Sequence, residues 1–409
     1  MTRSVLISGA GIAGPSLAYW LVRYGYAVTV VEQAPGPRYG GSAVDFRGDQ
    51  LALLERMGVL DEIRANQTGM GEQGIVDATG RRTAMLPAVL FSGEVEIDRG
   101  DLARILYEHS TGAEYVFGDQ ITALTERADT VEVEFANAGR REFDLVIGAD
   151  GLHSAVRRLA FGPAERFRTD LGYHAVAFTV PNTFGIDHSG LIYNEPNRYV
   201  SVTSAKNPAS SIVRLLFHAD GVSYDRRDPA ALRRVITEHF TGVGWHTPEL
   251  LAALSDATDL YVDSVSQIRL DRWSSGRIVL LGDAAWCAGP GGNGTGHAML
   301  GAYVLAGELA AAGGDHRVAF DRYEQAMRPA IEKSQKFATG AGRFLVPPTE
   351  RKIRQRDRTY RFLNSRLMSG LLHWLSTRNA NTGALTDYPD PEAGFRVEIG
   401  VSPDPAARS

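Results

Sequence analysis

The sequence is most informative at Val5-Leu6-Ile7-Ser8-Gly9-Ala10-Gly11-Ile12-Ala13-Gly14. Its apolar beginning is typical of a buried strand, and the segment from Ile12 to Tyr24 is typical of a helix. A strand, a glycine turn and a helix direct backbone N–H groups and the positive end of the helix dipole toward one point, where a pyrophosphate can bind. The stretch therefore predicts the opening βαβ unit of a dinucleotide-binding domain.

Each glycine of the turn has its own expected role. Gly9 allows the tight turn, Gly11 lets a phosphate approach the backbone, and Gly14 lets the helix pack closely on the strand. The next strand, residues 27–31, ends in Glu32. A carboxylate there is placed to accept hydrogen bonds from both hydroxyls of an adenosine ribose.

Composition excludes several other classes of protein. Arg3 before an apolar stretch could indicate a secretory signal, but the glycine spacing and the βαβ continuation argue against it. The single cysteine, Cys287, excludes an intrachain disulfide and a cysteine-based metal site, and it fits the cytoplasm; we expect no metal site. The net charge of −5 gives no reason to expect nucleic acid as a partner. The apolar stretch 298–312 is short and carries Glu308, so we expect no membrane span.

The chain of 409 residues is long enough for two domains. From about Tyr173 the sequence changes from alternating strands and helices to consecutive strands, which favours an inserted antiparallel sheet. The expected fold is α/β: a discontinuous Rossmann-like nucleotide-binding domain, an inserted antiparallel-sheet substrate domain and a C-terminal helix. The expected divisions are 1–172 and 271–340 for the nucleotide-binding domain, 173–270 with 73–97 for the insertion, and 341–409 for the C-terminal segment.

Local patterns predict four further elements. Residues 73–86 read as a hairpin with a central Asp-Ala-Thr-Gly turn, and residues 130–135 are expected to pair with 141–147. A long helix is expected over 295–312. Leucines at four-residue spacing predict a packed helix within 349–377; they are Leu363, Leu367, Leu371 and Leu375.

Three separated elements carry a resemblance to a known family: Gly9-x-Gly11-x-x-Gly14 with Glu32, Asp150-Gly151, and Gly282-Asp283-Ala284-Ala285. In this order they resemble the signatures of class A flavoprotein monooxygenases. That family includes para-hydroxybenzoate hydroxylase, aromatic polyketide hydroxylases and tetracycline-inactivating monooxygenases. The resemblance covers roughly residues 1–340 and is more specific for the fold than for the substrate.

The resemblance implies non-covalent FAD, with NADPH or NADH visiting as a transient reductant. In the family the acid matching Asp283 binds the ribityl chain, the arginine matching Arg99 lies near the pyrophosphate, and the Asp150 region supports both cofactors. Arg47 aligns with a position close to the mobile flavin ring. The cofactor-binding residues implied are Gly9, Gly11, Ala13, Gly14, Glu32, Arg47, Arg99, Asp150, Asp283, Pro290, Gly292 and Gly294.

Some of these residues could have a structural role instead of a role in cofactor binding. Ser154 could act as a helix N-cap after Asp150, and Asp283 could also be a capping residue. Arg99 could be an exposed arginine at a helix start, and Arg47 a solvent-facing loop residue.

The loop Pro290–Thr295 is expected to lie along the flavin ring, where N–H groups stabilise negative charge on reduced flavin. Two features depart from the family there. Trp286 stands where histidine is common, and the stretch from Pro290 to Gly294 is one residue shorter than usual. Both positions are expected to affect the pocket in which oxygen reacts.

Substrate contacts are expected from the inserted sheet. Arg214, Leu216 and His218 fall on one face of a strand because side chains alternate. In the family such a sheet covers the substrate, so Arg214 and His218 could anchor a phenolate or enolate oxygen. A pair of surface residues is the alternative. The sequence assigns no catalytic residue.

The resemblance thus implies an NAD(P)H- and O2-dependent enzyme that hydroxylates an aromatic or polycyclic phenol or enol through a C4a-hydroperoxyflavin. A polyketide or tetracycline-like molecule is the expected substrate, and a monomer or homodimer the expected state. The alternatives are a reductase or oxidase of the same fold, a halogenase, and a flavin-binding protein without catalysis. Around Trp245 the halogenase pattern lacks its second tryptophan.

Overall fold

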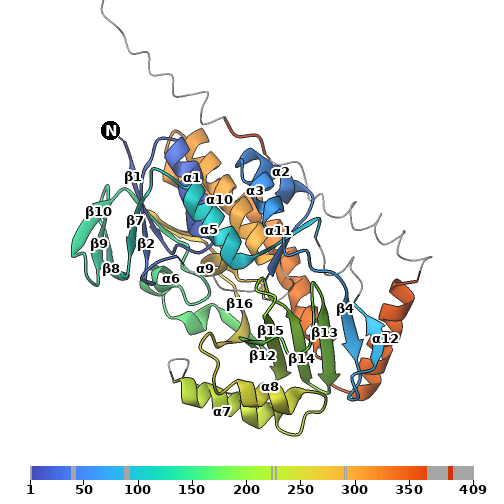
Figure 1. The fold of residues 1–409 in the computed structure, drawn as a ribbon. Helices are drawn as coiled ribbons and strands as arrows, with labels where there is room; N and C mark the ends of the chain where they lie inside the picture. The colour runs from blue at the N-terminus through green and yellow to red at the C-terminus, as the bar shows by residue number, and fades with distance from the viewer. Residues whose placement is uncertain are drawn as a thin grey trace, which may run out of the picture.

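The computed structural model describes residues 2–37, 43–86, 93–222, 224–225, 228–289, 291, 293–365 and 386–389. These residues form two large β-sheets with helices packed against them (Figure 1). Several residues named above lie outside the described part of the chain: Pro290, Gly292, Leu367, Leu371 and Leu375.

The first sheet is mainly parallel and carries the glycine turn. Its strands, in spatial order, are β17 (Ser274–Ser275), β18 (Ile278–Leu280), β11 (Leu145–Gly148), β1 (Ser4–Ser8), β2 (Ala27–Glu32) and β7 (Glu114–Phe117). β1 pairs in parallel with both β2 and β11, and β11 pairs in parallel with β18. The sheet therefore combines strands from before and after the second sheet, as the discontinuous α/β fold predicted.

The second sheet is antiparallel over most of its width. Its order is β16 (Tyr261–Ile268), β12 (Arg168–Pro181), β15 (Ser210–His218), β14 (Arg198–Ser204), β13 (Gly190–Glu195), β4 (Gln73–Val76) and β5 (Arg82–Met85). The predicted hairpin is β4–β5, and β4 joins the sheet in parallel with β13. Two smaller sheets complete the described strands: β3 (Ala43–Phe46) with β6 (Val95–Asp98), and β8 (Ile121–Glu126), β9 (Val131–Phe135) and β10 (Arg140–Phe143).

Helices cover the first sheet and pack on both faces of the second. The first set comprises α1 (Ala13–Arg23), α5 (Arg99–His109), α6 (Ala155–Ala160), α9 (Asp283–Trp286), α10 (Gly294–Ala311) and α11 (His316–Leu345). α10 is apolar on most sides because it packs between α1 and α11. The other helices are α2 (Asp49–Arg56), α3 (Leu60–Ala65), the short turn η1 (Ala164–Arg166), α7 (Pro229–Phe240), α8 (Thr247–Ala253) and α12 (Glu350–Leu363). α7 and α8 bury one face of the second sheet.

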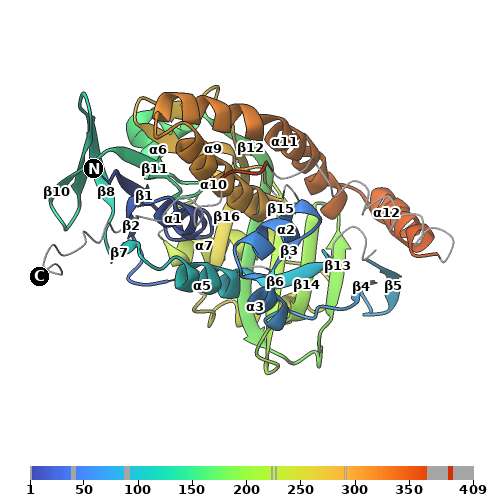
Figure 2. The ribbon, with the colours of Figure 1, turned by 90° about the horizontal axis from the view of Figure 1, so that it is seen from above.

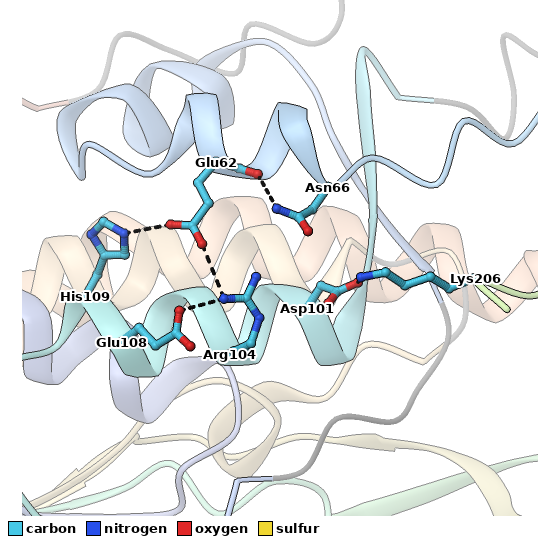
Figure 3. A network of polar contacts seen from close by, with 7 residues as sticks. All are labelled: Glu62, Asn66, Asp101, Arg104, Glu108, His109 and Lys206. Carbon is cyan, nitrogen blue, oxygen red and sulfur yellow. Dashed lines mark hydrogen bonds and ion pairs between the residues drawn. The ribbon is translucent and has the colours of Figure 1, made fainter.

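A polar network on α5 connects neighbouring parts of the fold (Figure 3). Glu62 of α3 accepts a hydrogen bond from Arg104 at 3.4 Å and pairs with His109 at 3.0 Å. Lys206, which follows β14, forms an ion pair with Asp101 at 2.7 Å. The ion pair between Lys206 and Asp101 fastens the second sheet to the first turn of α5.

The expected strand 141–147 is two strands. β10 pairs with β9 as predicted, but the chain turns at Asp144 and continues as β11 of the first sheet. The Asp144 carboxylate accepts hydrogen bonds from the N–H of Ser4 at 2.6 Å and from its hydroxyl at 2.9 Å. These bonds to β1 fix the point at which the chain changes sheets.

The C-terminal part differs in two respects. α11, a helix of 30 residues with Pro329 inside it, was not predicted, although its buried residues recur every three or four positions. Figure 2 shows it extending along α10 toward α12. The predicted C-terminal helix is present as α12, which ends at Leu363; the remaining part of the predicted range, 366–377, lies outside the described residues.

Candidate active site

The glycine turn has the geometry that a pyrophosphate-binding turn requires. Gly9 has φ +105°, a conformation that L-residues with a β-carbon rarely adopt, and its N–H donates to Val31 O at 2.7 Å. A β-carbon added at Gly14 would lie 1.9 Å from Gly9 O, so α1 packs directly on the turn. A β-carbon at Gly11 would meet no described atom within 4 Å. The space over Gly11 fits the close approach of a phosphate.

Glu32 is held beside this turn at the end of β2. Its carboxylate accepts hydrogen bonds from the N–H groups of Ala10 at 2.9 Å and Ala34 at 2.8 Å. The position fits contact with the ribose hydroxyls of a dinucleotide.

The third signature meets the first at the start of three helices. A β-carbon added at Gly282 would lie 3.3 Å from Cβ of Ala13 and 3.5 Å from Cβ of Ala298. One added at Gly294 would lie 3.6 Å from Oδ1 of Asp283. The fold thus brings α1, α9 and α10 together with a carboxylate between them. Asp283 is the first residue of α9, and the N-cap residue is Gly282.

The turn after β3 contacts the same helix start. The N–H of Arg47 donates to Oε1 of Gln50 at 3.3 Å. The Gln50 amide packs on α10, where a β-carbon added at Gly296 would lie 2.2 Å from Nε2. Asn293 precedes α10 in a left-handed conformation. Arg47 and Gly296, more than two hundred positions apart, are therefore both in contact with Gln50.

Asp150 caps a helix. Its Oδ2 accepts hydrogen bonds from the N–H groups of Ala155 at 2.8 Å and Val156 at 3.1 Å, and the Ser154 hydroxyl accepts one from Arg157 N at 2.9 Å. Burial raises the pKa of Asp150, and these hydrogen bonds oppose the rise. The N-cap alternative for Ser154 is therefore present in the structure.

Two residues that the sequence reasoning did not assign connect these signatures. Arg157 is 1% exposed and donates to Ala284 O at 2.8 Å and Leu152 O at 2.6 Å. His153 Nε2 lies 3.0 Å from Oδ2 of Asp263 in β16. The first contact joins the Asp150 region to α9, and the second joins it to the second sheet. Ala284 and Asp263 lie more than one hundred positions away in sequence, so local patterns could not indicate these two contacts.

Arg99 and Trp286 have opposite surroundings, one exposed and one buried. Arg99 opens α5 with an exposed side chain, and within the described residues that side chain makes no hydrogen bond or ion pair. Trp286 is 2% exposed, and its ring centroid lies 4.4 Å from that of Trp273 and 5.9 Å from that of Tyr323. The ring therefore packs in the core, and the expectation that Trp286 affects the oxygen pocket stays a prediction.

The second sheet separates the two expected substrate anchors. Arg214 donates to the Thr203 hydroxyl at 2.7 Å, whereas His218 makes an edge contact with the Tyr173 ring at 4.9 Å. Four residues of strand span about 13 Å, so one small oxygen cannot bridge the two side chains. Burial lowers the pKa of the Arg214 guanidinium, while the charges of Glu96 and other nearby groups oppose that effect.

Carboxylates of the β3–β6 pair face this arginine. Asp98 and Glu96 both act on the pKa of Arg214, so they lie within electrostatic reach of its guanidinium. Burial raises the pKa values of both carboxyls and of Asp45. The alternating acids of these strands were not assigned from sequence, because their position against the second sheet depends on tertiary packing.

Comparison with known proteins agrees with this geometry. Residues 2–338 match the family model described as an FAD binding domain. A flavin-dependent monooxygenase of Legionella longbeachae is 34% identical over 365 residues, covering 88% of this chain and 94% of the relative. An uncharacterized protein of Mycobacterium tuberculosis is 42% identical over 341 residues, covering 81% and 92%.

A solved structure extends the likeness to nearly the whole chain. The crystal structure of the tetracycline destructase Tet(51) superposes with a TM-score of 0.82 at 33% identity, covering 95% of this chain and 100% of that one. Among the described residues no helix is both long and apolar enough to cross a membrane. The chain belongs to the family defined by this FAD binding domain and is a class A flavin-dependent monooxygenase.

Proposed function

We propose that the protein uses NADPH or NADH and O2 to hydroxylate an aromatic or polycyclic phenol or enol, of polyketide or tetracycline-like structure. The observation that carries the proposal is the meeting of the glycine turn, Asp283 and the start of α10, together with a second sheet that presents Arg214. The names of the relatives support the substrate class, because one is a tetracycline destructase.

FAD would be held by residues from all three signatures. The turn at Gly9 and Gly11 receives the pyrophosphate, Glu32 the ribose, and Asp283 the ribityl chain. The N–H groups at the start of α10 would face the flavin ring, and the positive helix end would stabilise negative charge there. When bound, FAD supplies the electron transfer and the activation of O2. The chain itself binds, orients and excludes water.

Cys287 supports non-covalent attachment. Its Sγ lies 3.5 Å from Ser266 O, and burial raises the pKa of the thiol, with the Asp283 charge adding to the effect. A thiol that stays protonated is a poor nucleophile toward the flavin ring. Acid precipitation should therefore release all the flavin as FAD.

The substrate would lie against the face of the second sheet that bears Arg214, opposite to α7 and α8. Arg214 stands between Ala177 of β12 and Ser201 of β14, and both neighbours have small side chains. A guanidinium with small neighbours can meet a planar molecule and pair with its phenolate or enolate oxygen. His218 is the second anchor only for a substrate long enough to reach both.

The first experiment combines flavin analysis with a substrate screen. Purified protein should be yellow, release FAD, and oxidise NADPH or NADH faster when tetracyclines, phenols or aromatic polyketides are added. The comparison of the two coenzymes identifies the reductant. Stimulated coenzyme oxidation without any change in the added molecule would favour an oxidase. A yellow protein that oxidises neither coenzyme with any member of the panel would favour a flavin-binding protein without catalysis.

A further inference from the structure

Four residues near the C-terminus dock on the FAD-binding part of the molecule. We call Thr386–Pro389 the strap; it is the short red segment beside α10 in Figure 1. The ring of Tyr388 lies on Gly307, where an added β-carbon would be 2.2 Å from Cγ of the tyrosine. Its hydroxyl donates to Oε1 of Glu308 at 2.8 Å, and its ring meets that of Tyr303 edge-on at 5.3 Å.

Every residue of the strap has a partner. The contacts besides those of Tyr388 are Tyr303 Oη donating to Thr386 O at 2.8 Å, Tyr24 Oη donating to Pro389 O at 3.0 Å, and Arg56 pairing with the Asp387 carboxylate at 2.5 Å. The partners come from the end of α1, from α2 and from α10. We call these five residues the strap seat: Tyr24, Arg56, Tyr303, Gly307 and Glu308.

The strap seat combines features of peptide recognition. A rigid aromatic side chain fills a position that only glycine leaves open, and its hydroxyl reaches a carboxylate whose side chain is 13% exposed. Arg56 also donates to the Tyr303 hydroxyl at 2.8 Å, and that hydroxyl donates to the strap. Three consecutive strap residues are thus contacted in different ways. Thr386 ends a chain of hydrogen bonds, Asp387 pairs with the Arg56 charge, and Tyr388 packs on the surface left open by Gly307.

The strap also affects α2. At its first turn α2 touches α10 through Gln50, which accepts the N–H of Arg47. At its last turn Arg56 reaches Tyr303 and the strap. We infer that the strap seat is a peptide-binding surface whose ligand is the chain's own Asp387-Tyr388-Pro389, and that its occupancy holds α2 against α10 and so positions the Arg47 turn.

The test uses full-length Tyr388→Ala, which empties the strap seat, and a labelled peptide with the sequence of residues 385–391. The peptide should bind this variant saturably in fluorescence anisotropy and bind the wild type at least tenfold more weakly, because the tethered strap competes. A peptide with alanine in place of tyrosine should not bind. Amide hydrogen exchange in α2 should rise in Tyr388→Ala and return to the wild-type rate with saturating peptide.

Two further variants separate recognition from general stability. Tyr388→Phe keeps the ring on Gly307, so the peptide should bind it far more weakly than it binds Tyr388→Ala. Gly307→Leu fills the strap seat, so in a folded protein α2 exchange should rise without rescue by peptide. Failure of the peptide to bind Tyr388→Ala, or α2 exchange equal to that of the wild type in that variant, would overturn the inference; both readings are independent of turnover.

Discussion

Gly11 and Gly14 lie three residues apart and differ in the space around them. An added β-carbon meets nothing within 4 Å at Gly11 but lies 1.9 Å from Gly9 O at Gly14. We expect Gly11→Val to keep the thermal midpoint of the flavin-free protein and lose FAD affinity, because the side chain occupies the space proposed for the pyrophosphate. Gly14→Val, the matched variant, should lower the midpoint itself. Thermal unfolding and FAD titration of both variants measure the two effects, and normal FAD affinity in Gly11→Val would mean that the phosphate binds elsewhere.

Arg214 and His218 allow a similar comparison on the second sheet. Arg214→Gln removes a charged hydrogen-bond donor worth about 1.5–3 kcal/mol, so KM for the substrate should rise by roughly one to two powers of ten. FAD content should stay normal, because Arg214 lies on β15 of the second sheet, whereas the residues proposed to hold FAD belong to the first. His218→Gln is the control, and for a small substrate it should change KM little. Equal effects of the two substitutions would contradict the separate surroundings described for these side chains.

The short helix α9 begins at Asp283 in the site and ends at Trp286 in the core. Removing the buried ring leaves a cavity against Trp273 and Tyr323, so Trp286→Ala should cost about 3–5 kcal/mol of unfolding free energy. Trp286→Phe should cost less. Urea unfolding measures both changes in unfolding free energy. A peroxide assay on the same samples measures whether either substitution also affects the oxygen reaction. A Trp286→Ala protein that is as stable as the wild type but releases more peroxide would show that the Trp286 ring affects the oxygen pocket.

The packing of α7 on the second sheet contains a titratable group. Burial lowers the pKa of His174, whose ring stacks on Phe217 and whose Nδ1 lies 3.1 Å from the Tyr224 hydroxyl. The folded state therefore binds a proton less readily than the unfolded state, where the pKa is about 6.5. Stability should be full above that pH and fall as the pH drops through the lower folded value. Urea midpoints from pH 8 to pH 5 test this, with His174→Gln expected to show a smaller decrease.

For the molecule as a whole, the sequence predicted the elements that are determined by residues adjacent in the chain. The glycine turn, the hairpin β4–β5 and the start of α10 each follow from a few adjacent residues, and the order of three signatures indicated a discontinuous domain. Contacts between distant segments were not predictable. The Arg157 bonds to α9, the carboxylates facing Arg214 and the docking of Tyr388 depend on how the sheets and helices pack. The surroundings of Trp286 were not predictable either, because its position in a motif does not indicate the direction in which its ring points.

The central claim is that a flavin monooxygenase places a phenol or enol on the face that bears Arg214. The most direct measurement is mass spectrometry of the product formed under labelled O2, with NADPH or NADH, by the wild type and by Arg214→Gln. We predict one labelled oxygen atom per product molecule in the wild type, and in the variant a lower yield at limiting substrate despite normal FAD content. Coenzyme oxidation with no label in any product across tetracyclines, phenols and aromatic polyketides would contradict the account.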